Sequence, residues 1–344
     1  MFRSDLSQHL SRRALLGAAL ATLLLAGCGG DSGTTGNAKP PPGVSQSRFP
    51  ALLADAANVT KADFEPAAGH TLTQIAATAK SQAQLGFASS VIEPGANRLA
   101  FGVIDQQNNF LYGRTAVYVA RTQNSPARGP FVAPADTLVT KPAFRSQTAA
   151  AESSPIAAIY SANVTFPKAG KQIVLVMTKT PQGIAGGLAP ITVKDSKLPR
   201  VGQKMPPVDT ETVADAGGNE ASVDTRIPPA PELHQQHLKD VLGKKPVALL
   251  IATPQLCQSR VCGPVVDIEL QMKAEFGDKV AFIHQEVYKD NTVSKGLRDP
   301  LLQLHLETEP WLFAIRKDGT IAARVEGSFG VNTFRRAVEA ALRT

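Results

Sequence analysis

The hydrophobic positions of the first two thirds of the chain follow the pattern of β-strands. Six short runs rich in β-branched and aromatic residues are bounded by turn residues; they cover residues 85–92, 99–105, 116–120, 156–166, 172–178 and 189–193. Short strands at such spacing predict an antiparallel β-sandwich over residues 49–194. Ahead of them, apolar residues at helical spacing predict a short helix near residues 71–80.

After residue 231 the pattern changes to alternating strands and helices. The predicted elements are a helix at 234–242, a strand at 247–251, a helix at 265–276, a strand at 280–287, a helix at 297–306, strands at 311–315 and 320–325, and a helix at 331–342. The run 247–251 has no polar residue, which is typical of a strand covered on both faces. The order, βαβα followed by ββα, predicts a separate α/β domain over residues 232–344.

Two polar segments are expected to be linkers. Residues 28–48 are rich in Gly, Ser, Thr and Pro, so we expect a disordered tether. Residues 195–231 are punctuated by prolines and glycines and carry scattered acidic residues, among them Asp209, Glu211, Asp215, Glu220 and Asp224. Their spacing lacks the regular carboxylate ladder of a calcium loop, which favours a solvated linker.

The N-terminus has the pattern of a secretory signal. Arg12 and Arg13 precede the apolar run 14–26, which is too short to span a bilayer comfortably, although an uncleaved anchor is an alternative. The stretch Leu25-Ala26-Gly27-Cys28 resembles the bacterial lipobox. This resemblance implies removal of residues 1–27, diacylation of Cys28, and a lipid-anchored protein on the extracytoplasmic face of the cell membrane. The paired arginines resemble a twin-arginine signal, which would imply export of an already folded protein, although ordinary Sec leaders also carry paired arginines.

Composition narrows the possible partners. The 344 residues carry 36 Lys and Arg against 29 Asp and Glu, a formal net charge of +7. No block of basic residues is interleaved with aromatic residues in the sequence, so we expect no nucleic-acid partner.

The cysteines locate the candidate chemistry. Beyond Cys28, the chain has only Cys257 and Cys262, which follow the predicted strand 247–251. Five residues of regular helix rise about 7.5 Å, and Cα atoms beyond about 7 Å cannot be bridged. A disulfide between these cysteines therefore requires a non-helical loop. Pro264 favours a helix that begins near Gly263, which puts Cys262 at the helix N-terminus, where a thiolate is stabilised.

One hairpin of the predicted sandwich resembles a known family. Residues 162–175, Ala-Asn-Val-Thr-Phe-Pro-Lys-Ala-Gly-Lys-Gln-Ile-Val-Leu, resemble the strand–turn–strand of bacterial immunoglobulin-like modules. The resemblance implies an immunoglobulin-like sandwich that serves as an interaction or spacer module.

The C-terminal segment resembles the thioredoxin superfamily over residues 233–344. Glu309-Pro310-Trp311-Leu312-Phe313-Ala314-Ile315 resembles the segment in which a cis-proline opens the third strand. Residues 317–322 resemble the hairpin that follows, and Gly327 falls where the family keeps a glycine before the last helix. The fold class that follows is multidomain, with an immunoglobulin-like β-sandwich and an α/β thioredoxin-like domain.

The chain departs from the thioredoxin pattern in three ways. The cysteines are spaced Cys257-x-x-x-x-Cys262 in place of Cys-x-x-Cys, Leu256 stands where tryptophan is common, and residues 247–251 lack the frequent buried carboxylate. The longer spacing is similar to that of copper-chaperone and peroxiredoxin-like branches.

The thioredoxin resemblance implies thiol–disulfide exchange on exported proteins, without a cofactor. In family order Cys257 attacks and Cys262 resolves, with Pro310 beside the disulfide presenting backbone to the substrate. The helix-start argument instead favours Cys262 as the more stable thiolate, so both orders stay open.

Two other functions stay open. The first is a Cu(I) metallochaperone in which two thiolates and His284 or His305 bind the ion. The second is a non-enzymatic binding scaffold in which the disulfide only stabilises the fold.

Overall fold

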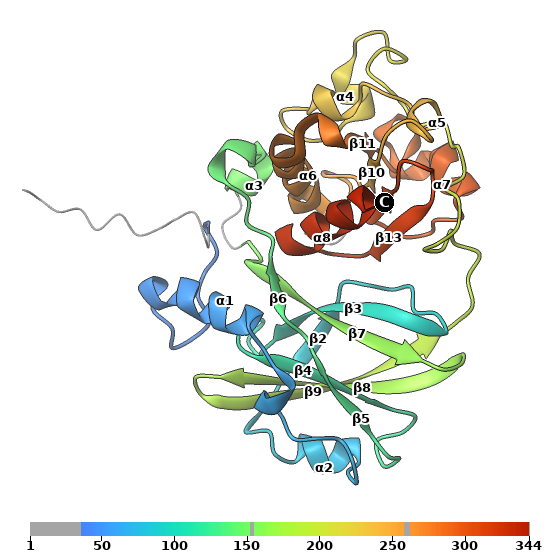
Figure 1. Cartoon of the computed structure of the whole chain (residues 1–344). Helices are drawn as coiled ribbons and strands as arrows, with labels where there is room; N and C mark the ends of the chain where they lie inside the picture. Colours follow the sequence, from blue (N-terminus) through green and yellow to red (C-terminus); the bar gives the residue numbers. More distant parts are fainter. Residues whose placement is uncertain (1–35, 152–154, 258–261, 344) are drawn as a thin grey trace, which may run out of the picture. The chain divides into compact units, whose positions relative to one another are not determined.

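The computed structural model describes residues 36–151, 155–257 and 262–343, with only the backbone of Cys262 and Gly263 (Figure 1). Residue contacts group Ser32–Thr344 into one compact unit. The described residues form a mixed α/β protein with three sheets, in which most strand pairs are antiparallel.

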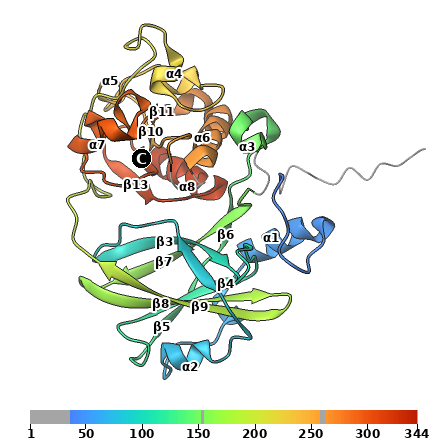
Figure 2. The ribbon, with the colours of Figure 1, turned by 180° about the vertical axis from the view of Figure 1, so that it is seen from behind.

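Two of the sheets are formed by the first part of the chain (Figures 1 and 2). One has the order β1-β9-β8-β4-β5, with β1 at Ser81–Gln82, β9 at Gly183–Val193, β8 at Gly170–Thr180, β4 at Thr115–Ala120 and β5 at Arg128–Val132. The other has the order β2-β3-β7-β6, with β2 at Gln84–Phe87, β3 at Gly95–Ile104, β7 at Ala158–Phe166 and β6 at Ala135–Thr137. Only the short β1–β9 pair is parallel among these described strands.

The two sheets bury one face each in a common hydrophobic cluster. Phe101 of β3, Val117 of β4 and Val174 of β8 all belong to it and are fully buried. Period-two alternation places every second side chain on one face. The opposite face of β4 and β8 is covered by α2 (Leu72–Ala76) and Phe64. Helix α1 (Phe49–Ala57) packs its buried side chains on the common cluster.

The third sheet is formed by the last part of the chain. Its order is β11-β10-β12-β13, with β11 at Ala281–Gln285, β10 at Val247–Ile251, β12 at Trp311–Ile315 and β13 at Ile321–Glu326. Strands β10 and β11 are parallel, and the other two pairs are antiparallel. The helices in this region are α4 (Glu220–Val223), α5 (Leu238–Val241), α6 (Cys262–Phe276), α7 (Asp299–Gln303) and α8 (Val331–Leu342).

Both faces of this sheet are buried. Leu250 of β10 and Leu312 of β12 lie in one cluster with α6 and α8. Leu249 and Phe313, their neighbours along the strands, lie in the cluster on the opposite face. This agrees with the apolar run predicted for β10, because a strand buried on both faces has no polar face.

Residues 195–231 are not the solvated linker that we expected, because part of this segment is buried. Leu198, Met205 and Val208 are buried against the second face of the third sheet. These three apolar residues are irregularly spaced and belong to no helix or strand, so the sequence shows no periodic pattern that would predict their burial. The irregular segment covers one face of the third sheet.

Residues 36–48, the described part of the expected tether, also differ from the prediction, because they pack on the folded chain. Ala38 is 2% exposed and belongs to the cluster between the first two sheets. Gln182 Nε2 donates a hydrogen bond to Pro42 O over 2.9 Å. A proline-rich segment can lie on a surface because it needs no hydrogen-bond ladder of its own.

All six strands predicted before residue 194 overlap observed strands, and α2 lies within the predicted helix. The segment 121–154 contains β5, β6 and α3 (Gln147–Ala151), which were not predicted. Pro130 lies within β5, at an edge of its sheet. Proline argues against a central strand but is tolerated at an edge, which only the sheet order reveals.

The predicted helix at 234–242 is reduced to α5 in the structure. Within the described ranges, no helix is long and apolar enough to cross a membrane. The predicted signal peptide and the lipid site at Cys28 lie outside the described residues.

Candidate functional site

The cysteine loop follows β10, as the sequence predicts. Cys257 is disulfide-bonded, and its partly buried side chain packs against the cluster under α6. Helix α6 begins at Cys262, close to the start that Pro264 predicts. The side chain of Cys262 and residues 258–261 lie outside the described part, so the pairing of Cys257 with Cys262 stays a prediction.

The segment before β12 lies beside the base of this loop. The Glu309–Pro310 bond is cis, as the thioredoxin resemblance implies. Ile251, the last residue of β10, pairs with Trp311, the first residue of β12. Thr253 N donates a hydrogen bond to Glu309 Oε2 over 3.0 Å. Glu309 therefore joins the start of the cysteine loop to the cis-proline segment.

Glu309 is a functional candidate that the sequence reasoning missed. Burial raises the pKa of its carboxyl group to about 7, and the charge of nearby Glu286 contributes in the same direction. The thioredoxin resemblance implies a buried carboxylate within the first strand, whereas this chain has a carboxyl group directly before the cis-proline. The sequence feature that could have identified Glu309 is its position directly before Pro310.

Glu309 should give the protein a measurable pH dependence of stability. The folded protein keeps its proton up to about pH 7, whereas an ordinary glutamate loses it near 4.5. The stabilising contribution is therefore complete below about pH 4.5 and lost as the pH rises through 7. Between pH 5 and pH 8 we expect the native protein to lose roughly 2 kcal/mol of unfolding free energy relative to Glu309→Gln, after allowance for solvent screening.

Urea denaturation of both proteins at several pH values measures this difference. Glu307→Gln, a change at an exposed neighbour, is the control and should keep the native pH dependence. An equal pH dependence in Glu309→Gln and the native protein would contradict the assignment.

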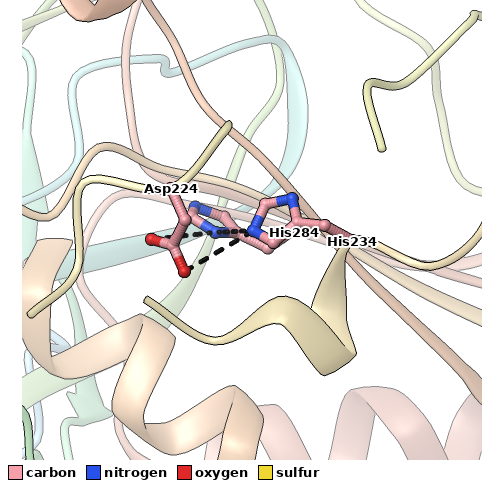
Figure 3. A group of neighbouring side chains, drawn as sticks. All are labelled: Asp224, His234 and His284. Carbon is pink, nitrogen blue, oxygen red and sulfur yellow. Dashed lines mark hydrogen bonds and ion pairs between the residues drawn. The ribbon is translucent and has the colours of Figure 1, made fainter. Parts of the chain in front are cut away.

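A second group of polar side chains is fully buried next to the third sheet (Figure 3). Asp224, His234 and His284 are each at most 1% exposed. One ring nitrogen from each histidine and one carboxylate oxygen of Asp224 lie within 4.8 Å of one another. We call these three residues the Asp–His–His cluster.

Asp224 is held by the loop that follows it. Its Oδ1 accepts a hydrogen bond from Arg226 N over 2.8 Å, and its Oδ2 accepts one from Ala230 N over 2.7 Å. Burial would raise the pKa of Asp224, but the neighbouring imidazoles of His234 and His284 and the backbone amide of Ala230 outweigh it and lower the pKa below its usual range. Asp224 is therefore a carboxylate in a buried position.

His284 enters the cluster from β11. Its Nε2 lies 3.0 Å from Ala252 O, and because a carbonyl oxygen can only accept, Nε2 carries the proton. Burial lowers the pKa of His284. Its Nδ1 lies within hydrogen-bond distance of His234 Nε2, at 3.2 Å.

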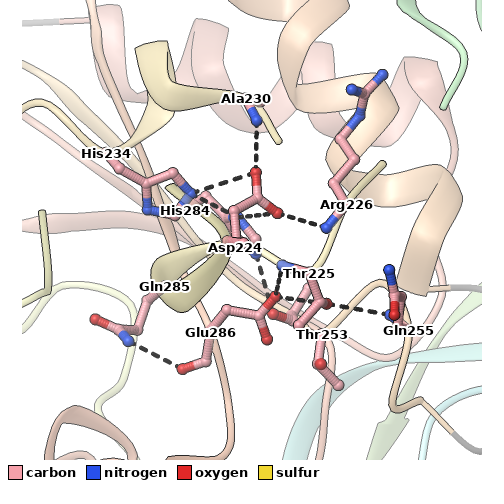
Figure 4. A network of polar contacts seen from close by, with 12 residues as sticks. Asp224, Thr225, Arg226, Ala230, His234, Thr253, Gln255, His284, Gln285 and Glu286 are labelled. Atoms are coloured by element: carbon pink, nitrogen blue, oxygen red, sulfur yellow. Dashed lines mark hydrogen bonds and ion pairs between the residues drawn. The ribbon is translucent and has the colours of Figure 1, made fainter. Parts of the chain in front are cut away.

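Thr225, the residue after Asp224, connects Glu286 to the cysteine loop (Figure 4). Its backbone N and Oγ1 both donate to Glu286 Oε1 over 2.7 Å. The same Oγ1 accepts a hydrogen bond from Gln255 N over 3.2 Å. Burial raises the pKa of Glu286. One polar network therefore runs from the end of β11 to the residues just before Cys257.

The two histidines considered as Cu(I) ligands have different surroundings. His284 is buried, and its ring nitrogens lie next to His234 and Ala252. His305 is exposed and follows α7 with a positive φ of 56°. Asp224 and His234 were not predicted as site residues, since Asp224 lies in the expected linker and His234 at the start of an expected helix.

Comparisons with known proteins leave the family open. No family model matches the chain, and no curated protein matches it. Among solved structures, the PKD domain of an M14-like peptidase from Thermoplasmatales archaeon SCGC AB-540-F20 is similar with 12% sequence identity. The match covers 33% of this chain and 95% of that one, with a TM-score of 0.17, a likeness too slight to support an argument.

Proposed function

We propose that the protein is a membrane-anchored, extracytoplasmic thiol–disulfide oxidoreductase that acts on exported proteins. The observation that carries the proposal is the hydrogen bond of 3.0 Å between Thr253 N and Glu309 Oε2. It holds the loop of the disulfide-bonded Cys257 next to the cis-proline segment at Pro310. The chain order of β10, α6, β11, α7, β12, β13 and α8 agrees with the proposed thioredoxin-like domain.

The proposed reaction exchanges one disulfide for another. A thiolate of Cys257 attacks a substrate disulfide, forms a mixed disulfide and releases one substrate thiolate. A thiolate of Cys262 then attacks the Cys257 sulfur, which forms the Cys257–Cys262 disulfide and releases the second substrate thiolate. Two electrons pass from the protein to the substrate, and the reverse sequence oxidises a substrate dithiol.

The other parts of the chain have supporting roles in this proposal. Diacylated Cys28 holds the protein at the membrane. The two sheets before residue 194 form an immunoglobulin-like module that acts as a spacer or binds a partner. They support this role because their strands are antiparallel in every described pair except β1–β9.

Trapping of mixed disulfides tests the proposal. With Cys262→Ser we expect Cys257 to stay linked to exported proteins, visible as gel shifts that a reductant removes. The matched Cys257→Ser variant should trap at least about tenfold less, because the attacking sulfur is gone. Alkylation of the native protein should also show a pair that is reduced and reoxidised by thiol buffers.

Three outcomes would contradict the proposal. A pair that stays oxidised in every thiol buffer would remove the redox role. Tight Cu(I) binding that either serine substitution abolishes, without insulin reduction, would favour the metallochaperone. Full function in both serine variants would favour the binding scaffold.

A further inference from the structure

In the Asp–His–His cluster the two imidazoles lie within hydrogen-bond distance of each other, but the Asp224 carboxylate lies farther from both rings. His234 Nε2 lies 3.6 Å from Asp224 Oδ2, and His284 Nδ1 lies 3.8 Å from Asp224 Oδ1. Hydrogen bonds from N–H to oxygen usually span about 2.7–3.2 Å. Both separations are therefore too long for direct hydrogen bonds, although the three side chains converge on one point (Figure 3).

We propose that Asp224, His234 and His284 bind a divalent transition-metal ion, with Zn²⁺ as the best fit. A tetrahedral zinc ion with bonds of about 2.0–2.2 Å has neighbouring donor atoms about 3.3–3.6 Å apart. The three separations in the cluster are 3.2, 3.6 and 3.8 Å. The two distances to Asp224 end on different carboxylate oxygens, and one ligand atom from each residue lies within 4.8 Å of the others, so small side-chain rotations would bring all three residues into contact with one ion.

The orientation of His284 suits a metal ligand. Metal-binding histidines commonly donate their second ring N–H to a backbone carbonyl or a carboxylate, which fixes the ring. Here Nε2 of His284 donates to Ala252 O over 3.0 Å, so Nδ1 presents its lone pair to the cluster. The Asp224 carboxylate is fixed in the same way by the amides of Arg226 and Ala230.

Two unpartnered polar groups lie in the same region. His234 Nδ1 and both carboxyl oxygens of Glu269 are buried without a hydrogen-bond partner among the described residues. Glu269 belongs to α6 and is 0% exposed, and the charge of Asp224 acts on its carboxyl group. Glu269 does not belong to the group whose ligand atoms lie within 4.8 Å of one another, so the three side chains of the cluster supply the protein ligands of the proposed site.

The charges around Asp224 also favour a bound cation. The guanidinium group of Arg226, the cation nearest in sequence, pairs with Asp267 over 2.8 Å. Among the described residues, no lysine or arginine side chain contacts the Asp224 carboxylate. A buried carboxylate is costly without a compensating cation, and a divalent ion would supply that charge.

The predicted role of the ion is structural. All three side chains are at most 1% exposed, so a substrate has no access, as in closed zinc sites. Asp224 and His234 come from an irregular segment, whereas His284 comes from β11. The ion would therefore fasten this segment to the third sheet and stabilise the folded chain.

Zinc titration of the untagged, full mature chain tests the proposal. After treatment with a chelator, we expect one equivalent of Zn²⁺ to bind, measured by competition with a chromogenic chelator, and to raise the midpoint of thermal unfolding. Co²⁺ in its place should give the visible absorption of a four-coordinate site. His234→Gln and Asp224→Asn should each weaken Zn²⁺ binding at least about 100-fold.

His237→Gln is the matched control. His237 also lies between two aspartates, with Nδ1 3.0 Å from Asp209 and Nε2 3.6 Å from Asp215, but it is partly exposed. This variant and Cys257→Ser should both keep the native stoichiometry and affinity, which separates the site from the proposed redox function.

Some results would overturn the proposal. They are the absence of Zn²⁺ and Co²⁺ binding to the native protein, loss of binding in His237→Gln, and native affinity in Asp224→Asn or His234→Gln. Circular dichroism shows whether each variant is folded. Asp224→Asn keeps an oxygen that can accept a hydrogen bond from a loop amide, so it serves as the second variant if His234→Gln does not fold.

Discussion

Replacement of Asp267 by alanine is expected to lower the free energy of unfolding by about 3–5 kcal/mol. The side chains of Asp267 and Arg226 are 1% and 6% exposed, and Oδ1 of Asp267 lies 2.8 Å from Nε of Arg226. The other carboxylate oxygen accepts a hydrogen bond from Ser146 N over 2.9 Å. Alanine would leave a buried guanidinium charge and a buried amide without their partner.

The arginine cannot easily leave its position. Its Nη1 and Nη2 donate to the carbonyl oxygens of Pro228 and Phe144 over 2.6 and 3.0 Å. Arg226 therefore connects α6, the segment before α3 and the loop that holds Asp224. We expect Asp267→Ala to disturb the Asp–His–His cluster as well as the fold.

Urea denaturation of the full chain measures this effect against two controls. Asp267→Asn keeps the shape and an acceptor for Ser146 N, so it isolates the cost of the lost charge. Glu275→Ala removes an exposed pair in which Glu275 Oε1 lies 2.8 Å from Arg335 Nε, with the Glu275 side chain 41% exposed. That change should cost less than about 1 kcal/mol. Equal losses in Asp267→Ala and Glu275→Ala would contradict the prediction.

Gly327→Ala is expected to destabilise the protein by about 3 kcal/mol or more. Gly327 has a φ of 76°, and a Cβ atom there would lie 1.7 Å from Ala88 O. Ala88 O is backbone and accepts a hydrogen bond from Ser328 N over 2.8 Å, so it cannot move aside without losing that bond. The turn after β13 therefore requires both the positive φ and the missing side chain.

Gly296→Ala separates these two requirements. Gly296 has a φ of 80°, but no atom lies within 4 Å of its added Cβ. This change should cost only the backbone strain, about 1–2 kcal/mol. The difference between the two variants, measured by urea denaturation, reports the steric overlap with Ala88. Similar losses at both positions would show that no such overlap exists in solution.

Elements with a strong local pattern could be predicted closely. Strands β10 and β12 and helix α8 have the predicted bounds to the residue, Val247–Ile251, Trp311–Ile315 and Val331–Leu342. Each strand is wholly apolar and each of its residues is buried, so local composition alone marks it. The helix start near Gly263 followed from Pro264, whose fixed φ suits the first turn.

The site could be predicted only in part. The sequence by itself located the cysteine pair after β10 and the cis-proline before β12, because both depend on short motifs of adjacent residues. Burial of Glu309 and the hydrogen bond to Thr253 depend on the antiparallel pairing of β10 with β12. No local pattern specifies that pairing.

The Asp–His–His cluster depends entirely on tertiary structure. His234 and His284 are 50 residues apart in the chain, and Asp224 lies in a segment without periodicity. Hydrophobic period reports which face of an element is buried, but it does not say which polar groups from distant segments share that burial. Only the path of residues 195–234 along the third sheet brings Asp224 and His234 to His284. Their positions follow from packing against the sheet and not from any local preference.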